Sequence, residues 1–239
     1  MSQFTWFSGR GPALLEAQLD RRAQLKPPAA LDSRPLGEQR LVVLDLETSG
    51  LDTKRDRILS IGAVAIEHGA IDLGQQFERT LQCQDQPLGP SVLIHGLAPS
   101  AIAAGMEPAE ALLDFMEFLG DSPLLAFHAA FDRHMLGRAL KRSLGQRLSH
   151  PFFDAAELAP LLCPQAHIPR GGLDDWTRYF GLQVQQRHHA SADALVTAEL
   201  ALILFSRARR QQLDSLLALQ QRLASWRRWQ RAHSLHPQH

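Results

Sequence analysis

The chain has 239 residues, of which 45% are hydrophobic and 21% are charged, as is ordinary for one sizeable globular domain with extensions. Its 25 basic residues balance its 25 acidic residues, so any affinity for polyanions must come from local patches. No apolar run is long enough to span a membrane, and the first residues lack the pattern of a secretory signal. The two cysteines match neither a zinc-binding spacing nor a disulfide framework. We therefore expect a cytoplasmic protein.

The first half of the chain predicts three neighbouring strands. Residues 41–47 begin as an apolar run of strand-forming residues. Residues 58–66 and 71–81 predict two further strands, with a hairpin turn at His68-Gly69 between them. Strands joined by such short connections predict an antiparallel half of a sheet. Upstream, residues 12–25 predict a helix that ends at a proline-rich break.

Helices alternate with short strands in the second half of the chain. Apolar residues recur there at the three- and four-residue spacing of a helix that buries one face. Strands that come first and helices that alternate later favour an α/β protein with a mixed sheet. The expected elements are a helix over 107–119, a strand over 123–127, a helix over 130–144, a short strand over 152–154, helices over 155–162, 173–180 and 191–207, and a last helix from Leu213 to Trp226.

Two acids interrupt the apolar run of the first strand. Because residues two apart in a strand point to the same face, the side chains of Asp45 and Glu47 are expected to lie side by side. Two carboxylates held together on a central strand need a compensating charge, and a divalent cation such as Mg²⁺ prefers oxygen ligands of this kind. The alternative is a strand end at which both acids are hydrated.

Two later stretches each place an acid at the start of an expected helix. Asp132 follows the strand over 123–127, at a position where the helix dipole also favours a carboxylate, so helix capping is the alternative explanation. Asp193 lies in the first turn of the helix expected over 191–207, and His188 lies five residues before it. An ordinary surface histidine is the alternative for His188.

In this order, these residues resemble the motifs of the DEDDh family of 3′→5′ exonucleases, which includes the proofreading (epsilon) subunit of bacterial DNA polymerase III and ribonuclease T-type enzymes. The motifs are Asp-x-Glu in the first strand, Ala-Ala-Phe-Asp ending at Asp132, and His-x₄-Asp from His188 to Asp193. The resemblance covers about residues 41–204 and implies an RNase H-like exonuclease fold, a five-stranded mixed sheet flanked by helices. The tyrosine branch of the superfamily is excluded, because the only tyrosine, Tyr179, lies on a different expected helix.

The resemblance also implies roles for individual residues. Asp45, Glu47, Asp132 and Asp193 are expected to bind two divalent cations, Mg²⁺ with Mn²⁺ as a substitute. His188 is expected to accept the proton of the attacking water, because imidazole gains and loses a proton near neutral pH.

Substrate contacts are expected around these residues. Leu51 is expected to pack on the terminal base, with burial in the core as the alternative, and His95 matches a position near the terminal phosphate. The family usually has His-Asn where this chain has Phe127-His128, so His128 is expected to brace the site differently or to alter substrate preference. The turn expected to hold the terminal nucleotide consists of Thr48, Ser49, Gly50 and Leu51.

The expected function is metal-dependent hydrolysis of single-stranded nucleic acid from its 3′ end, more of DNA than of RNA, with release of nucleoside 5′-monophosphates. One alternative is a catalytically weak accessory or nucleic-acid-binding module of a polymerase or repair complex. Another is a phosphodiesterase for short oligonucleotides.

Three parts of the chain are expected: a helical arm over residues 1–36, the exonuclease domain over 37–206, and an arginine-rich helical extension over 207–239. The extension has apolar residues at helical spacing beside its arginines. It is expected to pack on the domain, to bind a protein partner, or to contact nucleic acid.

Overall fold

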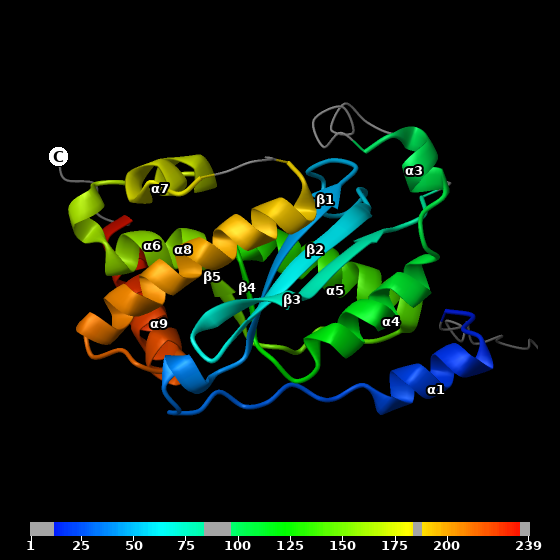
Figure 1. Ribbon diagram of the computed structural model, residues 1–239, viewed down its shortest axis with the longest axis horizontal. Coiled ribbons are helices and arrows are strands. Elements are labelled where there is room, and N and C mark those ends of the chain that lie inside the picture. Colours follow the sequence, from blue (N-terminus) through cyan, green and yellow to red (C-terminus); the bar gives the residue numbers. More distant parts are fainter. Residues whose placement is uncertain (1–11, 84–96, 184–187, 235–239) are drawn as a thin grey trace, which may run out of the picture.

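A five-stranded mixed sheet forms the centre of the protein in a computed structural model that describes residues 12–83, 97–183 and 188–234 (Figure 1). The strand order is β3-β2-β1-β4-β5. β1 and β3 each pair antiparallel with β2, whereas β4 pairs parallel with β1 and with β5. The expected mixed sheet is therefore confirmed. The strands span Leu41–Thr48 (β1), Ile58–Glu67 (β2), Ala70–Thr80 (β3), Leu124–Ala126 (β4) and Phe152–Asp154 (β5).

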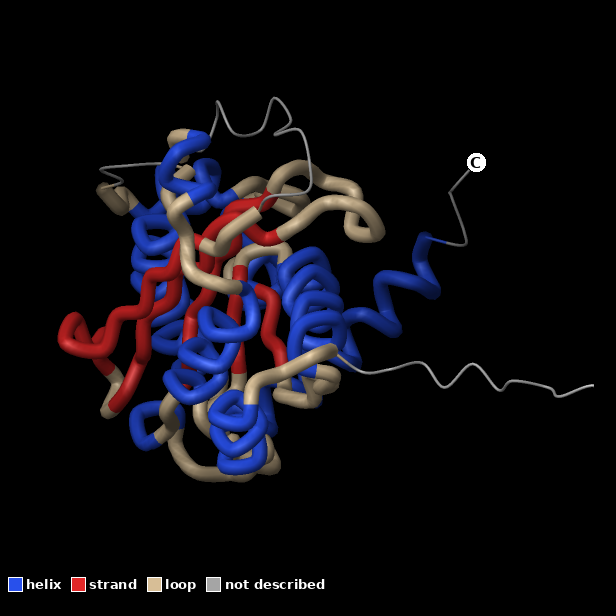
Figure 2. Tube along the Cα trace, turned by 90° about the vertical axis from the view of Figure 1, so that its right-hand side faces the viewer, coloured by secondary structure: helices blue, strands red, loops and turns tan. Residues whose placement is uncertain are grey.

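Helices cover both faces of the sheet (Figures 1 and 2). α8 lies across β1, β2 and β3 on one face and packs against α6 and α7, and α9 packs on α6. α4 and α5 pack together on the other face, and α1 lies against α4. None of the helices in the described part of the chain is both long and apolar enough to cross a membrane. The helices span Glu16–Gln24 (α1), Pro99–Ala103 (α3), Pro108–Leu119 (α4), Ala129–Leu144 (α5), Ala155–Leu162 (α6), Leu173–Phe180 (α7), Ala190–Arg210 (α8) and Leu216–Ser234 (α9).

Alternation along β1 divides the interior into two cores. Leu41 and Val43 are buried in the core on the α8 side. Val42 and Leu44 are buried in the core on the α4–α5 side. Because side chains alternate between the faces of a strand, the later odd-numbered residues of β1 project to the α8 side.

One helix was not expected, and several element bounds differ from the expected ones, the first helix spanning 16–24 and not 12–25. α3 was not expected, and it is a five-residue helix with Pro99 in its first turn, a favoured position for proline. α8 continues past the boundary expected after residue 206 and ends at Arg210, just before Gln212 adopts a left-handed φ of 61°. The last helix begins at Leu216 and not at Leu213.

The C-terminal helix α9 packs on the domain. Leu216, Leu219 and Leu223 are buried in the same core as α6 and α8. On its exposed side, Arg227 forms an ion pair with Glu157 of α6, with Nε 3.0 Å from both carboxylate oxygens. Of the three interpretations of the extension, these contacts favour packing.

Truncation of a buried leucine in α9 is expected to destabilise the whole domain. Leu219 has no exposed surface, so Leu219→Ala should lower the free energy of unfolding by about 2–5 kcal/mol, as buried leucine-to-alanine changes do. Denaturant unfolding measures this loss. The matched control is Gln220→Ala at the adjacent exposed position, and an equal loss in both variants would show that α9 does not share the core.

Candidate active site

Asp45 and Glu47 lie near the C-terminal end of β1, on the side of the sheet that α8 covers. Asp45 is half-buried and Glu47 is only 4% exposed. In the ladder with β2, Asp45 lies opposite Gly62 and Glu47 opposite Ser60. The pairing register shifts directly after Glu47, and such a bulge re-aims the residues beside it. The two acids therefore share one face where the regular strand ends.

Gly62 allows α8 to begin directly over the sheet. A Cβ atom at this position would lie 2.1 Å from the carbonyl carbon of Ala190 and 2.2 Å from the backbone nitrogen of Ser191. Side chains do not tolerate such distances to backbone atoms, so only glycine permits this approach of β2 and α8. The approach brings Asp193, in the first turn of α8, over the acids of β1.

Gly62→Ala is therefore expected to move the start of α8 and damage the site. The added methyl group should lower the free energy of unfolding by about 1–3 kcal/mol, as overpacking does, and displace Asp193. Thermal unfolding and the rate of nucleic-acid hydrolysis measure the two effects. The control is Gly74→Ala, whose Cβ would meet only the side chain of Asp72 at 3.1 Å. Full hydrolytic activity of the Gly62 variant would contradict this role.

Three carboxylates form a compact cluster at this point. Ligand atoms of Asp45, Glu47 and Asp193 all lie within 4.8 Å of one another. Negative charges this close repel each other strongly in a partly buried site unless a cation compensates them. All the donors are oxygen atoms, which are the ligands that Mg²⁺ and Mn²⁺ take in proteins. The donor set therefore fits a divalent cation.

Asp132 lies beside this cluster but outside it. It occupies the first turn of α5 and is 4% exposed. Burial raises the pKa of its carboxyl group well above the ordinary value, and the negative charges of Asp154 and Glu47 raise it further. Within the described part of the chain, the 4.8 Å cluster comprises three acids and does not include Asp132. The structure thus brings three of the four expected metal ligands together. The fourth, Asp132, is close enough to Glu47 for the charge of Glu47 to raise its pKa.

His188 lies two residues before α8, and its backbone forms a hydrogen bond with the acidic cluster. Its N–H donates to Oδ2 of Asp193 at 3.1 Å, and its φ of 64° is left-handed. Non-glycine residues adopt this conformation uncommonly, although histidine is enriched among those that do. The side chain is exposed. His188 therefore combines a solvent-accessible imidazole with a backbone hydrogen bond to Asp193.

The neighbouring His189 is oriented by different contacts. Its Nε2 lies 3.4 Å from Oε1 of Glu78 on β3, and its Nδ1 lies 3.1 Å from the hydroxyl of Ser191. Its backbone carbonyl accepts the N–H of Asp193 at 2.9 Å. The two histidines are thus distinguished by the structure: the ring of His189 is engaged by β3 and by the start of α8.

The turn after β1 is held by its own polar side chains. The hydroxyl of Thr48 donates to the carbonyl of Gly50 at 2.8 Å. The hydroxyl of Ser49 donates to Asp56 at 2.9 Å and accepts the N–H of Arg57 at 3.0 Å. The tip of the turn, residues 51–55, is mostly exposed to solvent. Leu51 in this turn is 86% exposed, so burial of this residue in the core is ruled out.

Asp154 is a residue that the sequence interpretation did not assign to the site. It ends β5, is 9% exposed, and accepts hydrogen bonds from the N–H groups of His128 at 3.0 Å and Ala156 at 2.9 Å. Burial raises the pKa of its carboxyl group. His128 has a left-handed φ of 64° directly before α5, so its bond to Asp154 braces the turn that leads to Asp132.

The signal that could have found Asp154 is an acid at the carboxyl end of a strand expected to lie parallel to the first. Of the remaining expected substrate contacts, His95 lies outside the described residues.

The mixed sheet, its two helix layers and the carboxylate cluster at the end of the central strand define a nuclease with the RNase H-like exonuclease fold. A family model described as exonuclease matches residues 42–201, more than half of the chain. The chain belongs to this exonuclease family, and its motifs are those of the DEDDh branch.

Its sequence relatives include far longer proteins. The PolC-type DNA polymerase III of Oceanobacillus iheyensis is 28% identical over 204 residues, which are 85% of this chain and 14% of that protein. The PolC-type DNA polymerase III of Thermotoga maritima is 32% identical over 171 residues, which are 72% of this chain and 12% of that protein. The chain thus spans only a small part of the length of these relatives.

Solved structures of exonuclease I share the fold. One matches with a TM-score of 0.63 and 19% identity, covering 72% of this chain and 42% of the other. Exonuclease I of E. coli in complex with a dT13 oligonucleotide matches with a TM-score of 0.61 and 20% identity, covering 73% of this chain and 42% of that one. At these identities the similarity establishes the fold alone.

Proposed function

We propose that the chain is a metal-dependent 3′→5′ exonuclease that hydrolyses single-stranded nucleic acid, more DNA than RNA, and releases nucleoside 5′-monophosphates. The observation that carries this proposal is the cluster of Asp45, Glu47 and Asp193 within 4.8 Å on the central strand of an exonuclease-family chain. Structures of exonuclease I with dT13 and dA16 oligonucleotides support a single-stranded DNA substrate. The PolC-type relatives support work beside a DNA polymerase.

Four carboxylates are proposed to provide the metal site. Asp45, Glu47 and Asp193 supply clustered oxygen ligands, and Asp132 adds a buried carboxylate beside Glu47. These residues would hold two divalent cations of the Mg²⁺ or Mn²⁺ type, which would supply a water molecule of lowered pKa and compensation for the charge that develops on the phosphate and leaving oxygens. In the absence of cations these carboxylates would repel a phosphodiester.

His188 is proposed to act as the general base. Its backbone bond to Asp193 fixes its position relative to a metal ligand. Its side chain is exposed, so a proton accepted there can pass to solvent after each turnover. Asp154 contributes indirectly, because its bond to His128 holds the turn that precedes Asp132.

The turn after β1 is proposed to receive the terminal nucleotide. Leu51 offers an exposed apolar side chain on which a base can pack, and Thr48 and Ser49 fix the turn through their hydroxyl groups. His128, at the start of α5, is proposed as a further substrate contact. An accessory module without chemistry would not need these residues together with an intact set of four carboxylates and a histidine.

The test uses DNA and RNA oligonucleotides of one sequence, single- and double-stranded, labelled at either the 3′ or the 5′ end and incubated with Mg²⁺. Single strands should release the 3′ label first, as a nucleoside 5′-monophosphate, while 5′-labelled strands shorten stepwise. DNA should be degraded faster than RNA. Early release of the 5′ label, or dinucleotide products, would overturn the proposed direction or product.

A further inference from the structure

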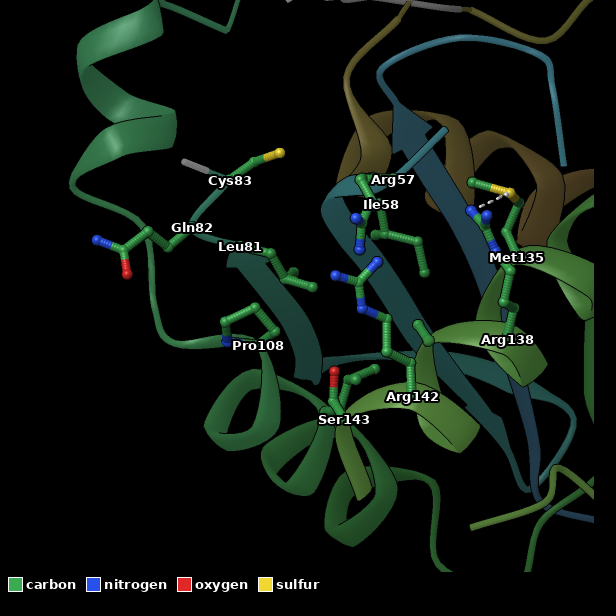
Figure 3. A pocket seen from close by; sticks show the side chains of 12 residues that line it. Arg57, Ile58, Leu81, Gln82, Cys83, Pro108, Met135, Arg138, Arg142 and Ser143 are labelled. Carbon is green, nitrogen blue, oxygen red and sulfur yellow. Dashed lines mark hydrogen bonds between the residues drawn. The ribbon is translucent and has the colours of Figure 1, made fainter. Parts of the chain in front are cut away.

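A pocket on the α4–α5 side of the sheet gathers three arginines, and none of the described residues that line it is an acid. It has a volume of about 170 Å³ and lies between α5, the start of α4, the start of β2 and the end of β3 (Figure 3). Arg57 directly precedes β2, and Arg138 and Arg142 belong to α5. The described residues that line it are Arg57, Ile58, Leu81, Gln82, Cys83, Pro108, Leu112, Met135, Arg138, Ala139, Arg142 and Ser143.

The three arginines lack carboxylate partners. Across residues 12–83, 97–183 and 188–234, no ion pair joins an acid to Arg57, Arg138 or Arg142. Among the described residues, the side chain of Arg138 donates one hydrogen bond, to the sulfur of Met135 at 3.7 Å. In Figure 3 the side chains of Arg57 and Arg142 extend toward each other from opposite walls. Converging guanidinium groups repel each other and form a strong receptor for an anion.

Asp52 and Asp56, two acids whose charges act on Arg138, form hydrogen bonds within their own turn. The charges of Asp52 and Asp56 reach Arg138, but burial and the positive charge of Arg57 dominate and lower the pKa of Arg138. Asp56 accepts hydrogen bonds from the hydroxyl of Ser49 and from the N–H of Asp52, at 2.9 and 2.7 Å. Asp52 accepts the N–H of its own turn at Lys54. These two carboxylates stabilise the turn and leave the pocket positively charged.

The rest of the lining is mostly apolar. Ile58, Leu81, Leu112 and Met135 belong to the core on the α4–α5 side and form the inner wall. A ligand that suits this pocket carries a negative charge for the arginines and a less polar body for the inner wall. A nucleotide has both parts, because its phosphate is a bidentate acceptor for arginine and its sugar and base offer apolar faces.

The pocket is connected to the acidic cluster by two elements. Ser49, two residues after Glu47, donates its N–H to the carbonyl of Arg57 at 2.9 Å. Along α5, Arg138 and Arg142 lie six and ten residues after Asp132, or about 9 and 15 Å along the helix axis. Such distances are spanned by a few nucleotides of an extended strand.

We propose that this arginine pocket binds a nucleotide phosphate, as a second nucleic-acid contact separate from the acidic cluster. The phosphate belongs either to an internal phosphodiester of a bound strand or to a free 5′-mononucleotide. Only the assignment to a substrate strand rests on the proposed exonuclease function.

The test measures binding without hydrolysis, in the Asp45→Ala background with EDTA. The probes are a fluorescein-labelled deoxythymidine strand of about 12 nucleotides and thymidine 5′-monophosphate. Arg142→Gln and Arg57→Gln should each lower strand affinity about 5–10-fold and reduce the slope of log affinity against log salt by about 1. Lys141→Gln is the matched control, because it removes the same charge one residue away, outside this lining. It should change strand affinity less than about 2-fold.

The two probes distinguish the two sources of phosphate. Loss of strand affinity with unchanged mononucleotide binding assigns the pocket to an internal phosphodiester, and parallel loss of both assigns it to the free nucleotide. Equal effects of Arg142→Gln and Lys141→Gln, or no effect of either pocket variant on either probe, would overturn the proposal. Failure of the wild-type chain to hydrolyse DNA would refute the proposed function and leave this binding result unaffected.

Discussion

Asp45→Ala is expected to reduce hydrolysis of single-stranded DNA to background while leaving the domain folded. Asp45 supplies one of three carboxylates within 4.8 Å, so its loss removes a metal ligand and at the same time relieves repulsion in the metal-free protein. Release of labelled mononucleotide measures the first effect. Thermal unfolding and calorimetric titration with Mn²⁺ measure fold and metal affinity. Asp20→Ala, at an exposed acid of α1, is the matched control and should retain full activity.

The dependence of hydrolysis on the metal ion supplied tests the same site in a second way. Mg²⁺ or Mn²⁺ should support hydrolysis by the wild-type chain, whereas Ca²⁺ should bind and support little, because its larger and looser coordination positions ligands less strictly. Chelation with EDTA should abolish activity, and added Mg²⁺ should restore it. Full activity after thorough metal stripping would falsify the proposed metal site.

Much of the fold could be predicted because its pattern is local. β1 begins as a continuous apolar run of strand-forming residues, and α4 and α5 repeat apolar residues at helical spacing. α3 was missed because five residues are too few to establish a helical period. The C-terminal helix was expected as a helix, but its partner was not predictable. Only the structure shows that Leu219 enters the core beside α6 and α8.

The candidate site likewise has residues that the sequence could predict and one that it could not. Asp45 and Glu47 were predicted as a pair because residues two apart in a strand share a face, and Asp193 was expected beside them through the resemblance to the exonuclease family. Asp154 was not assigned, since its bond to His128 spans 26 residues and depends on β4 and β5 being neighbours.

The importance of Gly62 was also hidden in the sequence. Its role depends on the crossing of β2 by α8, far along the chain. Contacts between distant segments, and not the motifs themselves, are what a single sequence leaves undetermined.

The two adjacent histidines before α8 provide the sharpest test of the proposed base. His188→Ala is expected to retain Mn²⁺ binding but to lower kcat by about 10²–10⁴, the usual cost of losing a general base. Its backbone bond to Asp193 does not require the imidazole, so the metal ligand should stay in place. Single-turnover hydrolysis of a labelled DNA strand, with Mg²⁺ in excess, measures the chemical step.

His189→Ala is the matched control for this prediction. The ring of His189 contacts Glu78 and Ser191, so its loss removes a bond to β3 without removing the proposed base. We expect a change in kcat of less than about tenfold, because no proton transfer depends on it. A larger loss from His189→Ala than from His188→Ala would reverse the assignment of the two residues. Equal, small losses would show that neither imidazole accepts the proton of the attacking water.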